Sequence, residues 1–131
     1  MDGVAYSGGC LCGAVRWAAK AEPVNVRLCH CRLCRRATGA PYFARALFPA
    51  DAVTRTGETT GFASSHRLVR RSCARCGTPV FAEPNDAPYL AVALGTLDQP
   101  EALAPGSHIW VSQKVPWVRL DDGLPQYPEG A

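Results

Sequence analysis

The chain lacks most of the sequence features that identify common enzyme and membrane-protein classes. No apolar run in its 131 residues is long enough to span a membrane. There is no glycine-rich phosphate loop or dinucleotide-binding fingerprint, and no Ser-His-Asp pattern is visible. The net charge of +3 is too small to indicate nucleic-acid binding on its own. We therefore expect neither a membrane nor a nucleic acid as a partner.

Export signals are also missing from the first residues. The segment from Met1 to Tyr6 has neither a basic start nor an apolar run, so no signal peptide is expected. Without export the predicted location is the cytoplasm, where clustered thiols bind metals more often than they form disulfides. The odd number of cysteines, seven, also fits a complete set of disulfides badly.

Helical periodicity is almost absent, and short segments with strand-like alternation recur between eleven prolines and twelve glycines. In residues 14–17, for example, Val15 and Trp17 fall on one face. Similar segments are residues 24–28, 42–48, 66–71, 79–82, 89–94 and 109–111. Only Arg32–Thr38 is expected to form a helical turn, and Gly39 would end it. The sequence predicts one mostly β domain over residues 1–131, with a loosely packed tail from Asp121.

The chain does contain cysteines, and they stand in three tight clusters. Spacings of one or two residues allow thiolates to converge on a single ion. The total divides into a set of four, which closes a tetrahedral zinc site, and a set of three, which leaves one position open. The clusters are Cys10 with Cys12, Cys29 with Cys31 and Cys34, and Cys73 with Cys76.

The set of four is interpreted as a structural zinc site. A glycine directly follows each pair, at Gly13 and Gly77. Such glycines permit tight turns whose backbone amides point at the sulfurs. A closed site of this kind can contribute on the order of 10 kcal/mol, which is comparable to the stability of a whole domain. The alternative is a redox-active Cys-x-x-Cys pair, which normally lies at the start of a helix in a βαβ unit. The predicted ligands are Cys10, Cys12, Cys73 and Cys76.

The set of three, Cys29, Cys31 and Cys34, is interpreted as an open zinc site. Three thiolates on Zn²⁺ carry a net charge of −1, and a thiol bound at the fourth position would be deprotonated at neutral pH. A closed site completed by His30 is one alternative, although on an extended segment its side chain should point away from its neighbours. Reactive or redox cysteines are the other alternative.

Four arginines lie close to this second cluster in the sequence. They can offset its negative charge, and guanidinium groups bind carboxylates in bidentate fashion. The other histidines, His66 and His108, are isolated on strand-like segments, so packed or hydrogen-bonded roles are expected for them. The four arginines are Arg27, Arg32, Arg35 and Arg36.

Together these motifs resemble the glutathione-dependent formaldehyde-activating enzyme family. The resemblance extends from about residue 6 to about residue 127, nearly the whole chain. It is carried by four ordered segments, GCLCGAV at residues 9–15, CHCRLC at 29–34, CARCGT at 73–78 and HIWVSQKVPW at 108–117.

The resemblance implies a β-rich fold of short curved antiparallel sheets, similar to the Mss4-like zinc proteins. It also implies two zinc ions, a structural one on the set of four cysteines and a second on Cys29, Cys31 and Cys34. The activity associated with the family is condensation of glutathione with formaldehyde to S-(hydroxymethyl)glutathione, formally a carbon–sulfur lyase reaction in reverse. The implied partners are therefore a small thiol and an aldehyde.

Two hypotheses of other classes stay open at this point. The chain could be a zinc-stabilised binding module without catalysis, although it has no basic or proline-rich arm for nucleic acid. It could also be a redox-responsive zinc protein that releases metal when Cys29, Cys31 and Cys34 are oxidised.

Overall fold

The computed structural model describes residues 5–130, so residues 1–4 and 131 of the predicted domain lie outside the described part. Two β-sheets make up most of it. The smaller sheet has the strand order β1 (Tyr6–Gly9), β2 (Arg16–Ala19) and β5 (Val53–Thr56). The larger sheet has the order β10 (Ser107–Ile109), β3 (Asn25–Cys29), β4 (Phe43–Pro49), β9 (Tyr89–Ala93), β8 (Pro79–Pro84), β7 (Leu68–Cys73) and β6 (Thr59–Ser65).

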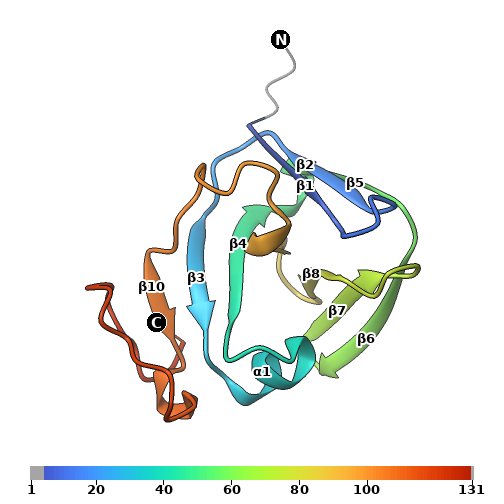
Figure 1. Cartoon of the computed structure of the whole chain (residues 1–131). Coiled ribbons are helices and arrows are strands. Elements are labelled where there is room, and N and C mark those ends of the chain that lie inside the picture. Colours follow the sequence, from blue (N-terminus) through green and yellow to red (C-terminus); the bar gives the residue numbers. More distant parts are fainter. Residues whose placement is uncertain (1–4, 131) are drawn as a thin grey trace.

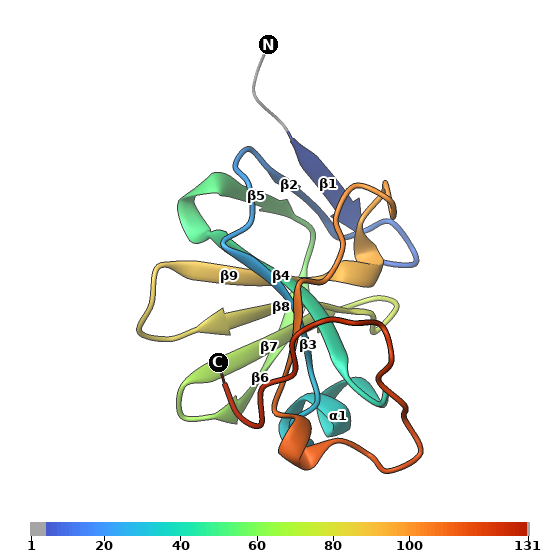
Figure 2. The ribbon, with the colours of Figure 1, turned by 90° about the vertical axis from the view of Figure 1, so that its left-hand side faces the viewer.

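Neighbouring strands are antiparallel except for β10, which pairs with β3 in parallel. The larger sheet is strongly curved, with β1, β2 and β5 at one end of the molecule and α1 (Arg32–Thr38) at the other (Figures 1 and 2). Three short 3-10 turns, η1 (Ala50–Ala52), η2 (Leu94–Thr96) and η3 (Val111–Gln113), complete the described elements. The predicted mostly β class is confirmed, and the antiparallel prediction is wrong only at β10.

The alternation of side chains along β4 separates two environments. Ala46 and Phe48 are fully buried on one face, in the main core between the sheets. Phe43, Arg45 and Leu47 lie on the opposite face and line a cavity. The strand thus contributes to the core with one face and to the candidate site with the other.

The main core is built around Trp17 and Phe48, whose ring centroids lie 6.1 Å apart. Trp17 is 2% exposed, and its indole N–H donates to the Thr96 hydroxyl at 3.0 Å. Burying a large aromatic side chain contributes about 2–3 kcal/mol, so this contact holds the smaller sheet firmly against η2.

The predicted helical turn is confirmed as α1. Its N-cap is Cys31, whose sulfur accepts a hydrogen bond from the Cys34 amide at 3.3 Å. Gly39 ends the helix in the left-handed conformation with φ of 71°, and its amide donates to the Arg35 carbonyl. Among residues 5–130 the model has no helix with the length and apolar character needed to cross a bilayer.

Other sequence predictions need correction. β1, β5 and β6 were not expected, whereas His66 lies in the β6–β7 turn and Val111 lies in η3. The segment from Asp121 is mostly exposed, as expected for a loosely packed tail, but its pairing with β10 was not expected. Its backbone accepts from the His108 and Trp110 amides through Pro125 and Glu129. Figure 1 shows this C-terminal segment in red alongside β10.

Candidate metal centres

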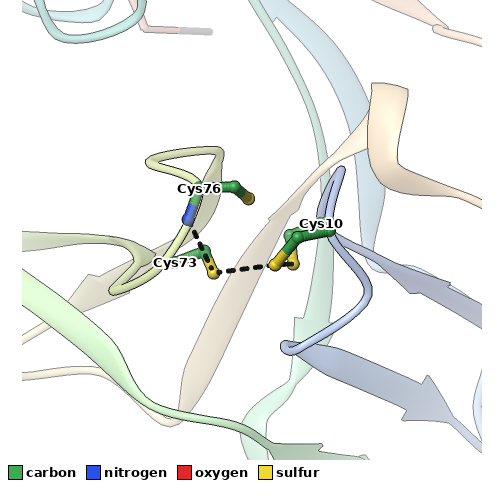
Figure 3. A group of neighbouring side chains, drawn as sticks. Cys10, Cys73 and Cys76 are labelled. Carbon is green, nitrogen blue, oxygen red and sulfur yellow. Dashed lines mark hydrogen bonds between the residues drawn. The ribbon is translucent and has the colours of Figure 1, made fainter.

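The four-cysteine set converges from two distant segments. Cys10 and Cys12 follow β1, whereas Cys73 ends β7 and Cys76 lies in the turn before β8. The Sγ–Sγ distances are 3.7 Å for Cys10–Cys12 and 3.8 Å for Cys12–Cys73. Four sulfurs at about 2.3 Å from one zinc ion lie about 3.8 Å apart in a tetrahedron, so this geometry fits zinc. Figure 3 shows Cys10, Cys73 and Cys76 gathered at this point.

Backbone amides surround these sulfurs as the sequence predicted. The Val15 amide donates to Cys10 Sγ at 3.2 Å, and the Cys76 amide donates to Cys73 Sγ at 3.4 Å. Both turns depend on a glycine with positive φ, 83° at Gly13 and 79° at Gly77. Such amides stabilise thiolates, which is the form that binds a metal.

The Thr78 hydroxyl adds to this stabilisation from the side of β8. It lies 3.1 Å from Cys76 Sγ and accepts from the Leu11 amide at 3.2 Å. The hydrogen bonds of Thr78, followed by that of the Cys12 amide, lower the pKa of Cys76 to about 5. Thr78 therefore connects the two segments directly, in addition to any shared metal.

The three-cysteine set lies at the opposite end of the molecule, where β3 runs into α1. Cys29 is the last residue of β3, Cys31 is the N-cap of α1, and Cys34 lies in its first turn. Their sulfurs all lie within 4.8 Å of one another. The sequence brings them together because a strand end and a helix start are joined by a single residue, His30.

The ionisation of these three thiols is strongly unequal. Hydrogen bonds with Cys29 and Cys34 hold the pKa of Cys31 far below its ordinary value. Hydrogen bonds with Cys31 and Cys34 raise the pKa of Cys29 far above its ordinary value. Three thiolates this close repel one another, so only a bound cation can hold all three in the charged form. The donor set thus fits zinc, with three protein ligands and one position left for another donor.

A guanidinium group lies directly against this cluster. Arg70 on β7 donates to Cys34 Sγ at 3.4 Å, and its Nε donates to the Ser64 hydroxyl at 3.0 Å. Its guanidinium also lies 5.9 Å from the Phe43 ring centroid. These contacts fix a positive charge beside a cluster that would carry −1 with zinc.

His30 lies outside the cluster, as its place on an extended segment suggested. Its Nε2 lies 2.9 Å from Nδ1 of His108, and His108 Nε2 lies 2.8 Å from an oxygen of Asp122. Both rings are fully buried. Desolvation, followed by the charges of His108 and Lys114, lowers the pKa of His30 to about 4. The geometry is therefore that of a hydrogen-bonded anchor, and the closed site with His30 as a ligand does not form in it.

Two cavities meet at the three-cysteine set. The outer groove, about 780 Å³, is lined by Arg32, Arg35 and Arg67 together with Ser65 and Gln113. The inner pocket, about 360 Å³, is lined by all three cysteines, Arg45, Arg70 and mainly apolar side chains. Both are bordered by Cys31, Leu33 and Trp110. A ligand in either cavity can therefore reach the same sulfur cluster.

The arginines of these cavities were only partly predictable. Arg32 and Arg35 line the outer groove as expected, whereas Arg27 and Arg36 line neither cavity. Sequence reasoning missed Arg45, Arg67 and Arg70, which lie on β4, in the β6–β7 turn and on β7. No local motif marks them, because they reach the cluster only through the pairing of distant strands.

Comparison with solved structures supports the fold. A Rhodobacter sphaeroides protein of known crystal structure superposes with a TM-score of 0.61 and 21% sequence identity. The match covers 92% of this chain and 98% of that one. At this identity the likeness concerns the fold alone.

Sequence comparison gives a more specific relationship. An uncharacterised lyase of Schizosaccharomyces pombe is 32% identical over 76 residues, which is 58% of this chain. The matched part is about 56% of that protein's own length. The model of the glutathione-dependent formaldehyde-activating enzyme family matches residues 5–113, which include all seven cysteines. The chain therefore belongs to the glutathione-dependent formaldehyde-activating enzyme family.

Proposed function

We propose that this protein is a zinc-dependent enzyme of the carbon–sulfur lyase type that joins the thiol of glutathione, or a related thiol, to an aldehyde. The simplest such product is S-(hydroxymethyl)glutathione. The observation that carries the proposal is the three-cysteine set, which has one ligand fewer than a closed site and opens onto two cavities. Family membership and the lyase-named relative support the same class of reaction.

The two cysteine sets take different roles in this proposal. Zinc held by Cys29, Cys31 and Cys34 would supply an open position at which a thiol loses its proton at neutral pH. The other set holds a structural zinc ion and stays away from substrate. Its ligands are Cys10, Cys12, Cys73 and Cys76.

The outer groove has the charge needed to bind glutathione, which carries two carboxylates. Within residues 5–130 no carboxylate lies within ion-pair distance of Arg32, Arg35 or Arg67. The Nε of Arg35 is buried and has no hydrogen-bond partner among the described residues. The guanidinium of Arg35 is thus unpaired within the described residues, and such a group at the wall of a groove suits a ligand carboxylate.

The reaction needs no oxidant or reductant. The thiol sulfur forms a bond to the carbonyl carbon, the π electron pair moves to the oxygen, and a proton converts that oxygen to a hydroxyl. Arg70, which donates to Cys34 Sγ, stabilises negative charge around the sulfur cluster throughout.

The test is the rate of S-(hydroxymethyl)glutathione formation by the zinc-loaded protein, measured above the spontaneous reaction. We expect acceleration by the wild-type protein and at least a tenfold rise in KM for glutathione in Arg35→Met, because that variant removes a carboxylate-binding group. Arg36→Met removes the same charge from the next residue, which lines neither cavity, and serves as the matched control. No acceleration by the wild-type protein would contradict the proposal.

A further inference from the structure

We infer that the inner pocket binds an aldehyde larger than formaldehyde that carries a carboxylate, an oxo acid, and that Arg45 is the group that binds this carboxylate. The inference rests on the proposed function, since it names the second substrate of the same site. It is carried by the size of the pocket, by its apolar walls and by the surroundings of Arg45.

The pocket is too large and too apolar to be explained by formaldehyde. Its volume of about 360 Å³ includes the space for a zinc ion and a thiol sulfur beside the three cysteines, but the remainder is still far larger than formaldehyde, which has only two non-hydrogen atoms. The walls come from the face of the larger sheet that is turned away from the main core. They include Phe43, Leu47, Leu68, Ala82, Ala91 and Ile109. Such walls favour a substrate with a carbon chain.

Arg45 lies among these walls without an acidic partner. Its Nη1 donates to the neutral side-chain oxygen of Asn25 at 3.0 Å. In the described part of the chain, no carboxylate lies within ion-pair distance of its guanidinium. Burial lowers the pKa of Arg45, which shows that its charge is poorly solvated where it lies. An anionic ligand would offset this desolvation.

Arg70, and not Arg45, is the guanidinium that hydrogen-bonds a sulfur of the cluster, at Cys34 Sγ. Arg70 is further held by Ser64 and lies over the Phe43 ring. The side-chain hydrogen bond of Arg45 goes instead to Asn25, and its fork of N–H donors suits a carboxylate in bidentate fashion.

The two cavities then hold one substrate each. The thiol lies in the outer groove, and the oxo acid lies in the inner pocket with its carboxylate at Arg45. Its carbonyl carbon faces Cys31, which borders both cavities. Beside Cys31 the sulfur of the substrate thiol bonds to this carbonyl carbon. The π pair moves to the carbonyl oxygen, and one proton converts that oxygen to a hydroxyl. The carboxylate takes no part in the bond changes and only fixes the orientation.

The test compares 4-oxobutanoate with its methyl ester, a neutral aldehyde of nearly the same shape, each with glutathione and the zinc-loaded protein. We expect the wild-type protein to have at least a tenfold higher kcat/KM for the oxo acid than for the ester. Arg45→Met should lower that ratio at least tenfold. Arg27 on β3 is paired with Arg45 and lines neither cavity. Arg27→Met should therefore leave the ratio unchanged.

A second readout does not depend on turnover. Butanoate, which cannot react, should bind the zinc-loaded wild-type protein in calorimetry, and Arg45→Met should raise its Kd at least tenfold. If the wild-type protein accelerates formaldehyde condensation but shows no preference for the oxo acid, the inference is overturned while the proposed function stands. If Arg45→Met lowered kcat/KM equally for the oxo acid and the ester, the inference would also be overturned, because Arg45 would then act on the thiolate. Failure with every aldehyde would overturn both.

Discussion

At the scale of single residues, the two cysteine sets differ in what lies against their sulfurs. Cys10 and Cys73 accept from backbone amides, and Cys76 lies against a hydroxyl. In the other set Cys31 also accepts from a backbone amide, but Cys34 accepts from Arg70, whose side chain lines a cavity. Backbone amides and a hydroxyl stabilise thiolates whose charge stays constant. A guanidinium beside a cavity can also stabilise the negative charge that a bound substrate adds.

This difference predicts unequal effects of the same substitution. Cys76→Ser should cost several kcal/mol or prevent folding, because the site that joins β1 to β7 loses a ligand. Cys34→Ser should lose one zinc ion and activity but keep a cooperative unfolding transition. The measurement is zinc content together with urea unfolding of both variants. Equal loss of folding in the two variants would contradict the division of roles.

Glu83 provides a residue-scale prediction for pH. Burial alone would raise its pKa, but hydrogen bonds from Arg71 and Arg55 outweigh this and hold the pKa below its ordinary value. A carboxyl whose pKa is lower in the folded state contributes stability that is complete above its ordinary pKa. That stability is lost as the pH falls through the folded value.

We therefore expect Glu83→Gln to lower the free energy of unfolding by about 1 kcal/mol at pH 7 and by less at pH 4. Urea midpoints of wild type and variant at both pH values measure this. Acid weakens zinc binding in both proteins alike, so only the difference between them is compared. A difference that stays constant between pH 7 and pH 4 would rule out the ionised pair as its source.

Residue-scale prediction from sequence succeeded where chemistry depends on close spacing. The spacing within each cluster brings its own cysteines together, and the division into four and three was predicted from the number of ligands that a zinc site needs. Arg45 and Arg70 could not be found in this way, since their approach to Cys34 depends on the register of five neighbouring strands, β3, β4, β9, β8 and β7. Register is set by turns and by burial over the whole sheet.

At the scale of elements, the C-terminal segment anchors the loop that carries the open site. Asp122 accepts from His108 on β10, and His108 in turn contacts His30 between Cys29 and Cys31. The carboxylate can only accept, so His108 Nε2 donates to it, and His108 Nδ1 and His30 Nε2 share one proton across their 2.9 Å contact. The C-terminal segment thereby fixes the orientation of the loop that carries Cys29 and Cys31.

This anchor can be tested at its exposed end. Asp122→Ala leaves a buried His108 donor without a partner and should lower the free energy of unfolding by about 1–3 kcal/mol. Asp122→Asn keeps an acceptor oxygen and should restore part of the loss. Asp121→Ala removes the same charge one residue away and is the control, with urea unfolding as the measurement. Equal effects at positions 121 and 122 would argue against the anchor.

Element prediction was accurate for segments with their own local signals. Arg32–Thr38 was predicted with its end at Gly39, which is a local signal, whereas its N-cap Cys31 was not predicted. β1, β5 and β6 were missed, since they are rich in glycine, threonine and serine and mostly lack buried side chains. The exposure of the tail was predicted, but its hydrogen bonds to β10 were not, because no local pattern reveals them.

At the scale of the whole molecule, the two cysteine sets lie at opposite ends of the sheets. The four-cysteine set joins segments 61 residues apart, where the smaller sheet meets the larger one. The three-cysteine set lies at the other end, between β3 and α1, below the curved face that forms the inner pocket. The end away from the four-cysteine set thus keeps an incomplete ligand set, of which Cys29 and Cys34 are buried and Cys31 is partly exposed.

The central claim is that one zinc site is closed and the other is open to a thiol. Native mass spectrometry of the wild-type protein, with and without glutathione, tests it most directly. We predict two zinc ions per chain and a glutathione adduct that disappears in Cys34→Ser. A single zinc ion, or two ions with no adduct, would contradict the claim.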